Sequence, residues 1–258
     1  MNIYFCPHCK SPLDTSRNDV FVCTSCAREY PVEYGIPLLG KDITAVTDQY
    51  WDTIEYSHRV EEHLLEFLPE GVVYETVLDL GCGDGRSTIP IRERGTTIVG
   101  LDTSVHYMLD LARKQFDNVY LVNGDAKNLP FPDTFFDLII SLSVVEHIPF
   151  ADIPRVCAEA YRVLKPGGRC LVRNDAWFYG VLEQLRLRPG QYGKKPDETH
   201  VNMMTGFRFK RALEGAGFVI VQEDHFPFYR YQKKYGIRLP LWIQRLFATH
   251  SNFICTRS

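Results

Sequence analysis

Apolar residues along the chain alternate between short runs typical of buried strands and longer stretches with helical spacing. The short runs are Val77–Leu80, Ile98–Leu101, Val119–Val122, Leu138–Leu142 and Cys170–Arg173. The helical stretches lie near residues 86–94, 104–116, 151–164 and 205–215. This alternation predicts an α/β fold with a mostly parallel, doubly wound sheet, which binds ligands at the carboxyl ends of its strands.

The pattern ahead of these runs is different. A turn is predicted at residues 14–19, followed by a short returning strand at Val20–Val22. Residues 43–70 are predicted to form a linker and then a helix, whose apolar positions are Tyr50, Trp51, Val60, Leu64, Leu65 and Leu68. The chain therefore divides into a small module at residues 1–42 and a larger domain at residues 43–258. The larger domain carries added stretches near residues 175–204 and 225–248.

The composition is that of an ordinary globular protein, with 45% hydrophobic and 24% charged residues in a chain of 258. No run approaches the roughly 18 apolar residues that a membrane-spanning helix needs. The N-terminus also lacks the basic stretch and apolar core of a secretory signal. We therefore expect a cytoplasmic protein whose eight cysteines are reduced.

Four of these cysteines form two CxxC pairs, which are separated by thirteen residues. Two such pairs on a hairpin-sized loop predict a Zn²⁺ ion bound by four thiolates. The predicted ligands are Cys6, Cys9, Cys23 and Cys26. Because they fill all four positions and leave none for water, the zinc is expected to be structural. A module of about forty residues has too little core to fold alone, so the metal stabilises it.

The stretch from Cys6 to about Gly40, which ends in Tyr30–Leu39, resembles the Trm112-like zinc ribbons. Such ribbons occur alone, as partners of methyltransferases, or fused ahead of one. A similar fusion occurs in bacterial ribosomal-RNA guanine methyltransferases, whose second cysteine pair usually includes a histidine. This chain has Cys26 instead, which argues against a specific assignment to the ribosomal-RNA enzymes.

A glycine-rich motif follows the first strand of the larger domain, in the sequence VLDLGCGDGR at residues 77–86. Small residues let the backbone approach a ligand closely, and the next helix offers unpaired N–H groups at its N-terminus. The acidic Asp79 ahead of Gly81 and Gly83 is poorly suited to a pyrophosphate. It suits a ligand that carries an ammonium and a sulfonium group.

The next strands also end in polar residues. Asp102 can accept hydrogen bonds from both hydroxyls of a ribose, and Thr103 or Ser104 is expected to cap the following helix. On that helix, Met108 can cover an adenine face.

Asp125, after the third strand, can accept from the exocyclic amine of adenine while the Ala126 backbone meets a ring nitrogen. Ser141, at the end of the fourth strand, is expected where the methyl donor meets its acceptor.

These motifs together resemble the class I S-adenosylmethionine-dependent methyltransferases, and most of all the "type 11" group that includes quinone-biosynthesis enzymes. The matching segments are Leu78–Gly85, Asp102, Gly124–Ala126, Phe136–Leu138 and Val163–Gly168, and the match covers about residues 50–224. The resemblance implies a Rossmann-like, mostly parallel seven-stranded sheet. It also implies an S-adenosylmethionine site built from Asp79, Gly81, Gly83, Asp102, Thr103, Met108, Asp125, Ala126 and Ser141.

Two histidines are candidates for a catalytic base. Methyl transfer is an in-line displacement from an activated donor, so a base is needed only if the acceptor must lose a proton. His147 lies in a Glu-His pair that similar enzymes often carry after the fourth strand, and packing or a place beside the cofactor explains it more simply. His200 lies between the fifth strand and the next helix, where related enzymes build the acceptor pocket.

The C-terminal third of the chain is basic, since residues 177–258 hold 13 Lys and Arg against 6 Asp and Glu. Both added stretches combine aromatic and basic residues: Trp177, Phe178, Tyr179, Tyr192, Lys194, Lys195, Phe226, Phe228, Tyr229, Arg230, Tyr231, Lys233 and Lys234. A lid over a small-molecule pocket fits this composition, as does a stacking surface for single-stranded RNA. A peripheral helix on lipid headgroups around Trp242 also fits, and the simplest interpretation is a packed cap.

We therefore predict an S-adenosylmethionine-dependent methyltransferase that acts on a small molecule or on a glycan or lipid intermediate. RNA is the alternative acceptor, but residues 1–42 hold four Lys and Arg against five Asp and Glu, a poor footprint for phosphates. A second alternative is a scaffold that binds the cofactor without catalysis, against which the complete set of cofactor residues argues. The acceptor atom and the oligomeric state stay open.

Overall fold

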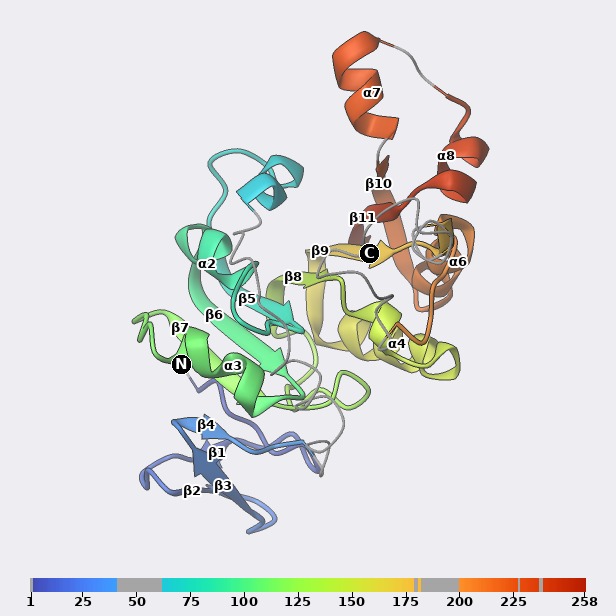
Figure 1. The fold of residues 1–258 in the computed structure, drawn as a ribbon. Coiled ribbons are helices and arrows are strands. Elements are labelled where there is room, and N and C mark those ends of the chain that lie inside the picture. Colours follow the sequence, from blue (N-terminus) through green and yellow to red (C-terminus); the bar gives the residue numbers. More distant parts are fainter. Residues whose placement is uncertain (1, 41–61, 179–180, 182–199, 227, 237–238) are drawn as a thin grey trace.

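The fold is described from a computed structural model, in which residues 1, 41–61, 179–180, 182–199, 227 and 237–238 lie outside the described part. The predicted helix positions Tyr50, Trp51 and Val60 fall in these gaps, as do Tyr179, Tyr192, Lys194 and Lys195 of the first added stretch. The described residues form two sheets, a small one near the N-terminus and a large one that carries the helices (Figure 1).

The large sheet has seven strands in the order β10-β11-β9-β8-β5-β6-β7. The strands are β5 (Tyr74–Leu80), β6 (Gly95–Asp102), β7 (Val119–Asn123), β8 (Phe136–Leu142), β9 (Leu164–Asp175), β10 (Phe218–Phe226) and β11 (His250–Arg257). The pairs from β9 to β7 are parallel, and β11 is antiparallel to both β9 and β10. The predicted α/β fold with a mostly parallel, seven-stranded sheet is confirmed.

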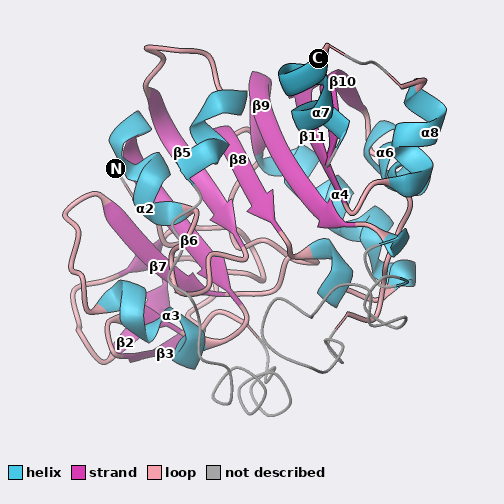
Figure 2. Ribbon diagram, turned by 45° about the horizontal axis from the view of Figure 1, so that its top comes forward, coloured by secondary structure: helices cyan, strands magenta, loops and turns pink. Residues whose placement is uncertain are grey.

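Helices cover both faces of this sheet (Figure 2). They are α2 (Thr88–Ile91), α3 (Val105–Ala112), α4 (Ile153–Val163), α6 (Gly206–Gly215), α7 (Phe228–Tyr235) and α8 (Leu241–Phe247), with short 3-10 helices at Glu62–Phe67, Arg92–Arg94, Val145–His147 and Phe150–Asp152. Among the described residues, none of these helices has the length and apolarity that a membrane crossing requires.

Consecutive strand residues belong to different hydrophobic clusters. Leu78 of β5 packs in the cluster that includes α4 and α6, whereas its neighbour Val77 packs in the one that includes Ile91 of α2. Successive side chains of a strand point to opposite faces, so a sheet covered on both faces needs apolar residues at every position. This is why the strands appear in the sequence as continuous apolar runs.

The small sheet has the order β1-β2-β3-β4 and is antiparallel throughout. Its strands are β1 (Leu13–Asp14), β2 (Val20–Cys23), β3 (Glu29–Glu33) and β4 (Ile36–Pro37), which confirms the predicted turn and returning strand. Tyr34 and Gly35 join β3 to β4 with φ values of 52° and 79°. Two positive φ angles in a two-residue loop are typical of a tight hairpin, in which glycine is favoured.

The small sheet packs against the large one beside β7 and α3 (Figure 1). The ammonium group of Lys10 donates to Asn128 Oδ1 at 2.7 Å and to the Leu129 carbonyl at 2.8 Å. The rings of Phe5 and Phe135 meet edge to face with centroids 5.3 Å apart. One hydrophobic cluster therefore spans both sheets. The predicted domain boundary near residue 42 lies outside the described residues and stays a prediction.

The two added stretches contact each other where they are described. The indole N–H of Trp177, just after β9, donates to the Leu246 carbonyl of α8 at 2.7 Å. The ring of Phe178 packs edge to face on Phe247, with centroids 5.5 Å apart. Helix α8 is thus fixed beside the end of β9, whereas α7 projects from the body of the molecule (Figure 1).

Candidate functional site

The polar residues predicted at the strand ends gather along one edge of the large sheet. Asp79 pairs with Gly100 across β5 and β6, and Asp102 pairs with Asn123 across β6 and β7. Because these strands are parallel, their carboxyl ends lie side by side. The candidate cofactor residues therefore come from separate strands but line the same edge.

The glycine loop after β5 has a backbone that only glycine tolerates well. Gly81, Gly83 and Gly85 have φ values of 79°, 47° and 91°. A Cβ atom on Gly83 would lie 2.2 Å from the ring of Tyr107, and one on Gly81 would lie 2.2 Å from a methyl group of Val144. Left-handed backbone and close packing both exclude a larger side chain, so the loop presents bare backbone at the edge.

Asp102 joins this loop to the start of α3. One carboxylate oxygen accepts from the Gly83 N–H at 3.0 Å, and the other accepts from the Ser104 N–H at 3.0 Å. Ser104 in turn caps α3, since its hydroxyl accepts from the Tyr107 N–H at 3.1 Å. The predicted cap is thus Ser104, and Thr103 precedes it with a half-buried side chain. Asp102 itself is half-buried, which leaves part of its carboxylate accessible.

Asp79 lies deeper than its neighbours and is fully buried. Its carboxylate accepts from the hydroxyl of Ser87 at 2.7 and 2.9 Å and from that of Thr88 at 2.5 Å. Burial raises the pKa of Asp79 to about 6, although the two hydroxyls act to lower it. Asp79 therefore holds the first turn of α2, and its contact with an ammonium or sulfonium group stays a prediction.

The end of β7 is held by the segment that follows β4. The N–H groups of Leu39 and Gly40 donate to the Asn123 carbonyl at 3.0 and 3.1 Å. A Cβ atom on Gly40 would lie 3.0 Å from the Asn123 side chain, so the approach is close. Beyond it, Asp125 is half-buried and accepts from the Lys127 N–H at 2.9 Å. The small sheet thus supports the loop that contains the predicted adenine contacts.

The remaining predicted cofactor residues are more deeply packed. Ala126 and Ser141 are buried. Met108 is fully buried in a cluster with Cys82, Val105 and Leu111. This packing places Met108 between α3 and the sheet, and its contact with an adenine face stays a prediction.

The two candidate histidines lie next to each other, although they are distant in the sequence. The ring centroids of His147 and His200 are 4.9 Å apart, with the ring planes inclined by 60°. The segment that contains His200 is held along the 3-10 helix after β8, because the Asn202 N–H donates to the Glu146 carbonyl at 3.0 Å. Both histidines are half-buried. The structure therefore brings His147 and His200 into one cluster beside the end of β8.

Glu146 completes this cluster, and sequence reasoning did not single it out. Its side chain is fully buried, and neither carboxylate oxygen has a hydrogen-bond partner among the described residues. Burial, and then the nearby charge of Asp175, raise the pKa of Glu146 well above its usual range. Asp175 ends β9, and one of its oxygens lies 3.3 Å from His250 Nε2. The only signal for Glu146 in the sequence is its place in the Glu-His pair.

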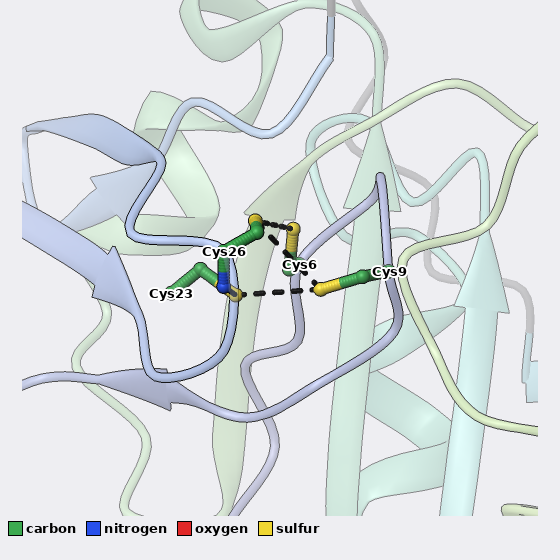
Figure 3. A group of neighbouring side chains, drawn as sticks. All are labelled: Cys6, Cys9, Cys23 and Cys26. Atoms are coloured by element: carbon green, nitrogen blue, oxygen red, sulfur yellow. Dashed lines mark hydrogen bonds between the residues drawn. The ribbon is translucent and has the colours of Figure 1, made fainter.

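The four cysteines of the small sheet face one another (Figure 3). The sulfur atoms of Cys6 and Cys26 are 3.7 Å apart, those of Cys9 and Cys23 are 3.4 Å apart, and those of Cys9 and Cys26 are 3.8 Å apart. Four sulfurs at about 2.3 Å from a tetrahedral zinc lie about 3.8 Å from each other, whereas a disulfide bond measures about 2.0 Å. The spacing therefore fits a tetrahedral metal shell.

The two cysteine loops have the same backbone geometry. The residue after each pair, Lys10 or Ala27, has a positive φ of 59° or 55°. The N–H group of each returns to the first cysteine of its pair, from Lys10 to Cys6 at 2.8 Å and from Ala27 to Cys23 at 3.0 Å. Each loop is therefore a tight turn that directs both of its sulfurs to one point.

Known proteins that resemble this chain are methyltransferases, in agreement with the cofactor residues predicted along this edge of the sheet. The methyltransferase domain family matches residues 78–172. The chain is 39% identical over 160 residues to a biotin biosynthesis bifunctional protein of Cellvibrio japonicus, covering 61% of this chain and 30% of that protein. It is 42% identical over 122 residues to a demethylmenaquinone methyltransferase of Tropheryma whipplei, covering 44% of this chain and 48% of that protein. It thus spans less than half the length of these two relatives.

A methyltransferase of Synechocystis that has no characterised activity is matched over more of its length. It is 36% identical over 153 residues, which cover 58% of this chain and 69% of that protein.

Solved structures share the fold at low sequence identity. A chain in the complex of the Haloferax volcanii Trm112 methyltransferase activator with a methyltransferase aligns with a TM-score of 0.57 and 20% identity, covering 81% of this chain and 90% of that chain. An S-adenosylmethionine-dependent methyltransferase of Mesorhizobium loti aligns with a TM-score of 0.55 and 21% identity, covering 76% and 96%. These structures share the fold. The methyltransferase domain match and the 36% identity to the Synechocystis methyltransferase over 69% of its length show that the chain belongs to the class I S-adenosylmethionine-dependent methyltransferases, which the strand order and the glycine loop fit.

Proposed function

We propose that the protein transfers a methyl group from S-adenosylmethionine to a small acceptor molecule bound beside the ends of β8 and β9. The observation that carries this proposal is the common edge on which the glycine loop, Asp102 and the cluster around His147 meet. When bound, S-adenosylmethionine supplies a methyl carbon that bonds to the acceptor atom while the carbon–sulfur bond breaks and leaves its electron pair on sulfur.

The residues of this edge fit such a cofactor. Bare backbone at Gly81 and Gly83 allows the amino-acid part of the cofactor to approach closely. The half-buried carboxylate of Asp102 accepts from the ribose hydroxyls, with Thr103 beside it. Asp125 and the Ala126 backbone then hold the adenine.

The buried Asp79 contributes charge to the same site. Its carboxylate is fully buried and depends on the hydroxyls of Ser87 and Thr88 to remain ionised. A cationic ligand nearby favours the ionised form. Asp79 therefore favours a positively charged cofactor over a neutral one.

His147 and His200 face the acceptor in this proposal. One of them takes the proton if the acceptor is a hydroxyl or another protonated group, since an imidazole nitrogen can act as a general base. Ser141, at the end of β8, contributes to the boundary between the donor and acceptor parts. Helix α8, fixed to Trp177, covers the acceptor side.

A small acceptor is favoured over RNA by the relatives. Their names include demethylmenaquinone and sterol methyltransferases. The basic residues of the C-terminal third do not require an RNA acceptor, because they can equally attract anionic groups on a metabolite or on a glycan or lipid intermediate. RNA binding that falls steeply as salt is added would favour the alternative acceptor, because phosphate contacts release counterions.

We further propose that Cys6, Cys9, Cys23 and Cys26 bind a structural Zn²⁺ ion in a Trm112-like ribbon. The sulfur spacing and the matched cysteine loops support it. Thiolate ligation also fits the cytoplasmic location expected from the sequence.

Calorimetric titration with S-adenosylmethionine tests the cofactor site. Asp102→Ala should weaken binding by about 100-fold, because it removes the ribose acceptor and the link to Gly83 (an amount typical of losing charged hydrogen bonds). Asp110→Ala is the matched control, since Asp110 lies on the exposed side of α3 and pairs only with Arg113 among the described residues. Equal affinity in the two variants would contradict the proposed site.

A further inference from the structure

Three side chains of metal-binding types meet beside the ends of β8 and β9, as a group separate from the cysteine cluster. They are Glu146 and His147 from the 3-10 helix after β8, and His200 from the segment that enters α6. One carboxylate with two imidazoles is a ligand set that proteins use for zinc and for non-haem iron(II), with coordination positions left open.

The three side chains are close enough to share one ion. One ligand atom from each lies within 4.8 Å of the other two. Ligands bound to one ion at about 2.1 Å lie roughly 3 to 3.5 Å apart, so small side-chain rotations close the shell. The inclined rings of His147 and His200, with centroids 4.9 Å apart, allow a nitrogen of each to face a common point.

The burial of Glu146 is a second observation that favours a cation at this cluster. Its side chain has no exposed surface, and neither of its oxygens meets a hydrogen-bond donor among the described residues. A buried carboxyl group without partners is costly whether it is ionised or protonated. A cation bound to one of its oxygens removes this cost.

The charges around the cluster also favour a cation. Asp175 adds a second carboxylate that acts on Glu146, and Arg173 adds one positive charge. Arg173 is engaged elsewhere, because its guanidinium donates to Asn252 Oδ1 at 2.8 Å. His250, which pairs with Asp175 across β9 and β11, has its Nε2 atom 3.3 Å from an oxygen of Asp175.

We propose that Glu146, His147 and His200 bind one divalent cation of the zinc, manganese or iron(II) class beside the ends of β8 and β9. The open coordination positions take the acceptor through two neighbouring oxygens, such as those of an ortho-diphenol or an enolised ketone. This substrate class rests on the proposed methyl transfer, whereas the metal site itself does not. A metal-bound hydroxyl loses its proton to solvent more readily, so that its oxygen is ready for methylation without a histidine base. With the cation bound, His147 and His200 therefore act as ligands rather than as proton acceptors.

Cobalt binding tests the metal site directly. The protein is first loaded with zinc at its cysteines and then titrated with Co²⁺. We expect one further equivalent to bind with visible d–d absorption and without a thiolate-to-cobalt charge-transfer band, because the new ligands are oxygen and nitrogen. Glu146→Gln and His200→Ala should each weaken this binding by at least about 100-fold. His106→Ala, on the exposed side of α3, should leave it unchanged.

The outcomes separate this inference from the proposed function. Glu146→Gln keeps the shape of a buried side chain, and His200 is only half-buried, so calorimetry with S-adenosylmethionine should report a folded cofactor site in both. Cobalt that binds only with thiolate absorption, or that binds to Glu146→Gln and His200→Ala as tightly as to the unaltered protein, overturns the metal site. Cobalt bound by the cluster in a protein that does not bind S-adenosylmethionine supports the metal site and overturns the proposed function.

Discussion

The carboxyl edge of the large sheet has two halves that satisfy their acidic groups differently. In the half proposed to bind the cofactor (the cofactor half), at the ends of β5, β6 and β7, Asp79 accepts from Ser87 and Thr88, and Asp102 accepts from Gly83 and Ser104. In the half proposed to bind the acceptor (the acceptor half), at the ends of β8 and β9, Glu146 has no such partner among the described residues.

This difference indicates two kinds of binding site. Donors that are already in place hold the cofactor half in one geometry, so a ligand has little to reorganise there. The unpartnered carboxyl of Glu146 instead stores an unfavourable energy that a ligand can relieve. The acceptor half is therefore the part whose stability should depend more on what is bound.

Removing the proposed zinc site should have the largest effect on stability, and of the two halves of the edge it should affect only the cofactor half. Zinc binding contributes on the order of 10 kcal/mol to the folding of small zinc modules. Cys23→Ala should therefore unfold the ribbon, measured as an early step in thermal denaturation. Because Leu39 and Gly40 hold Asn123, we also expect about tenfold weaker S-adenosylmethionine binding. Cobalt binding at Glu146 should not change.

Ser25→Ala is the control, because Ser25 lies exposed between the two cysteines of the same pair. Unchanged cofactor affinity in Cys23→Ala would show that the ribbon does not support the end of β7.

Replacing Asp79 should have the next largest effect on stability. The contribution of Asp79 to stability decreases as the pH rises, which is the opposite of the usual behaviour of an acidic group. Burial raises the pKa of Asp79 to about 6 from 3.8, so the folded state binds the proton more tightly than the unfolded state. Its contribution to stability is therefore greatest below about pH 4 and is lost as the pH rises through 6. At pH 8 the ionised group destabilises the protein by about 2 to 3 kcal/mol.

Asp79→Asn should accordingly raise the stability of the ligand-free protein at pH 8 while it weakens S-adenosylmethionine binding. Chemical denaturation at pH 5 and pH 8 measures the first effect and calorimetry measures the second. Lower stability of the variant at pH 8 would mean that the hydroxyls of Ser87 and Thr88 outweigh the burial of the charge.

The sequence predicts the cofactor half better because its contacts are local. Asp79, Ser87 and Thr88 lie within one strand–loop–helix unit, and the glycine motif that joins them is readable as a pattern. The strands were predicted for a similar reason, since a sheet covered on both faces requires unbroken apolar runs. The cluster of four cysteines was likewise predictable, because the two CxxC pairs are visible in the sequence.

The acceptor half could not be predicted in this way. His200 meets His147 only because residues 200–204 return along the helix after β8, a contact set by tertiary folding. Glu146 looks like an ordinary polar residue in the sequence, and its burial becomes evident only when β9 and β8 are side by side. The burial of Met108 between α3 and the sheet also could not be predicted, because helical spacing alone does not distinguish a core position from a position that contacts a ligand.

An ion pair that holds helix α8, beside the acceptor half, should have a smaller effect on stability, and this effect depends on pH. Arg245 of α8 forms a two-pronged ion pair with Glu223 of β10. Burial acts to raise the pKa of Glu223, but His225 and Arg245 outweigh it and lower the pKa to about 2 from 4.5. The stabilisation is therefore present above about pH 4.5 and is lost as the pH falls toward 2.

Glu223→Gln should cost about 2 kcal/mol at pH 7 and less than about 0.5 kcal/mol at pH 2, where about half of the carboxyl groups are protonated, measured by denaturation at both values. Asp224→Asn is the neighbouring control. Cofactor affinity should be the same in both variants, because α8 packs on α6, on β10 and on the residues just after β9, at the other end of the sheet from β5, β6 and β7. A loss of cofactor affinity in Glu223→Gln would break the division of the edge into two halves.

The smallest expected effect is a difference in stability between alanine substitutions at two glycines, Gly83 and Gly35, which both have a positive φ. Gly83 and Gly35 have φ values of 47° and 79°, so alanine at either position is strained by roughly 1 kcal/mol. Only Gly83 is also crowded, since its added Cβ would lie 2.2 Å from the ring of Tyr107, whereas Gly35 has no atom within 4 Å. Gly83→Ala should therefore cost about 1 to 2 kcal/mol more than Gly35→Ala in chemical denaturation.

The pair also separates stability from binding. Gly83→Ala moves the N–H group that donates to Asp102, so it should weaken S-adenosylmethionine binding, whereas Gly35→Ala on the far hairpin should not. Adding Tyr107→Ala to Gly83→Ala removes the crowding but leaves the backbone strain. If affinity then returns, the rigidity of the cofactor half comes from packing on Tyr107. If it does not, the left-handed backbone of the loop is itself the element that holds Asp102 in place.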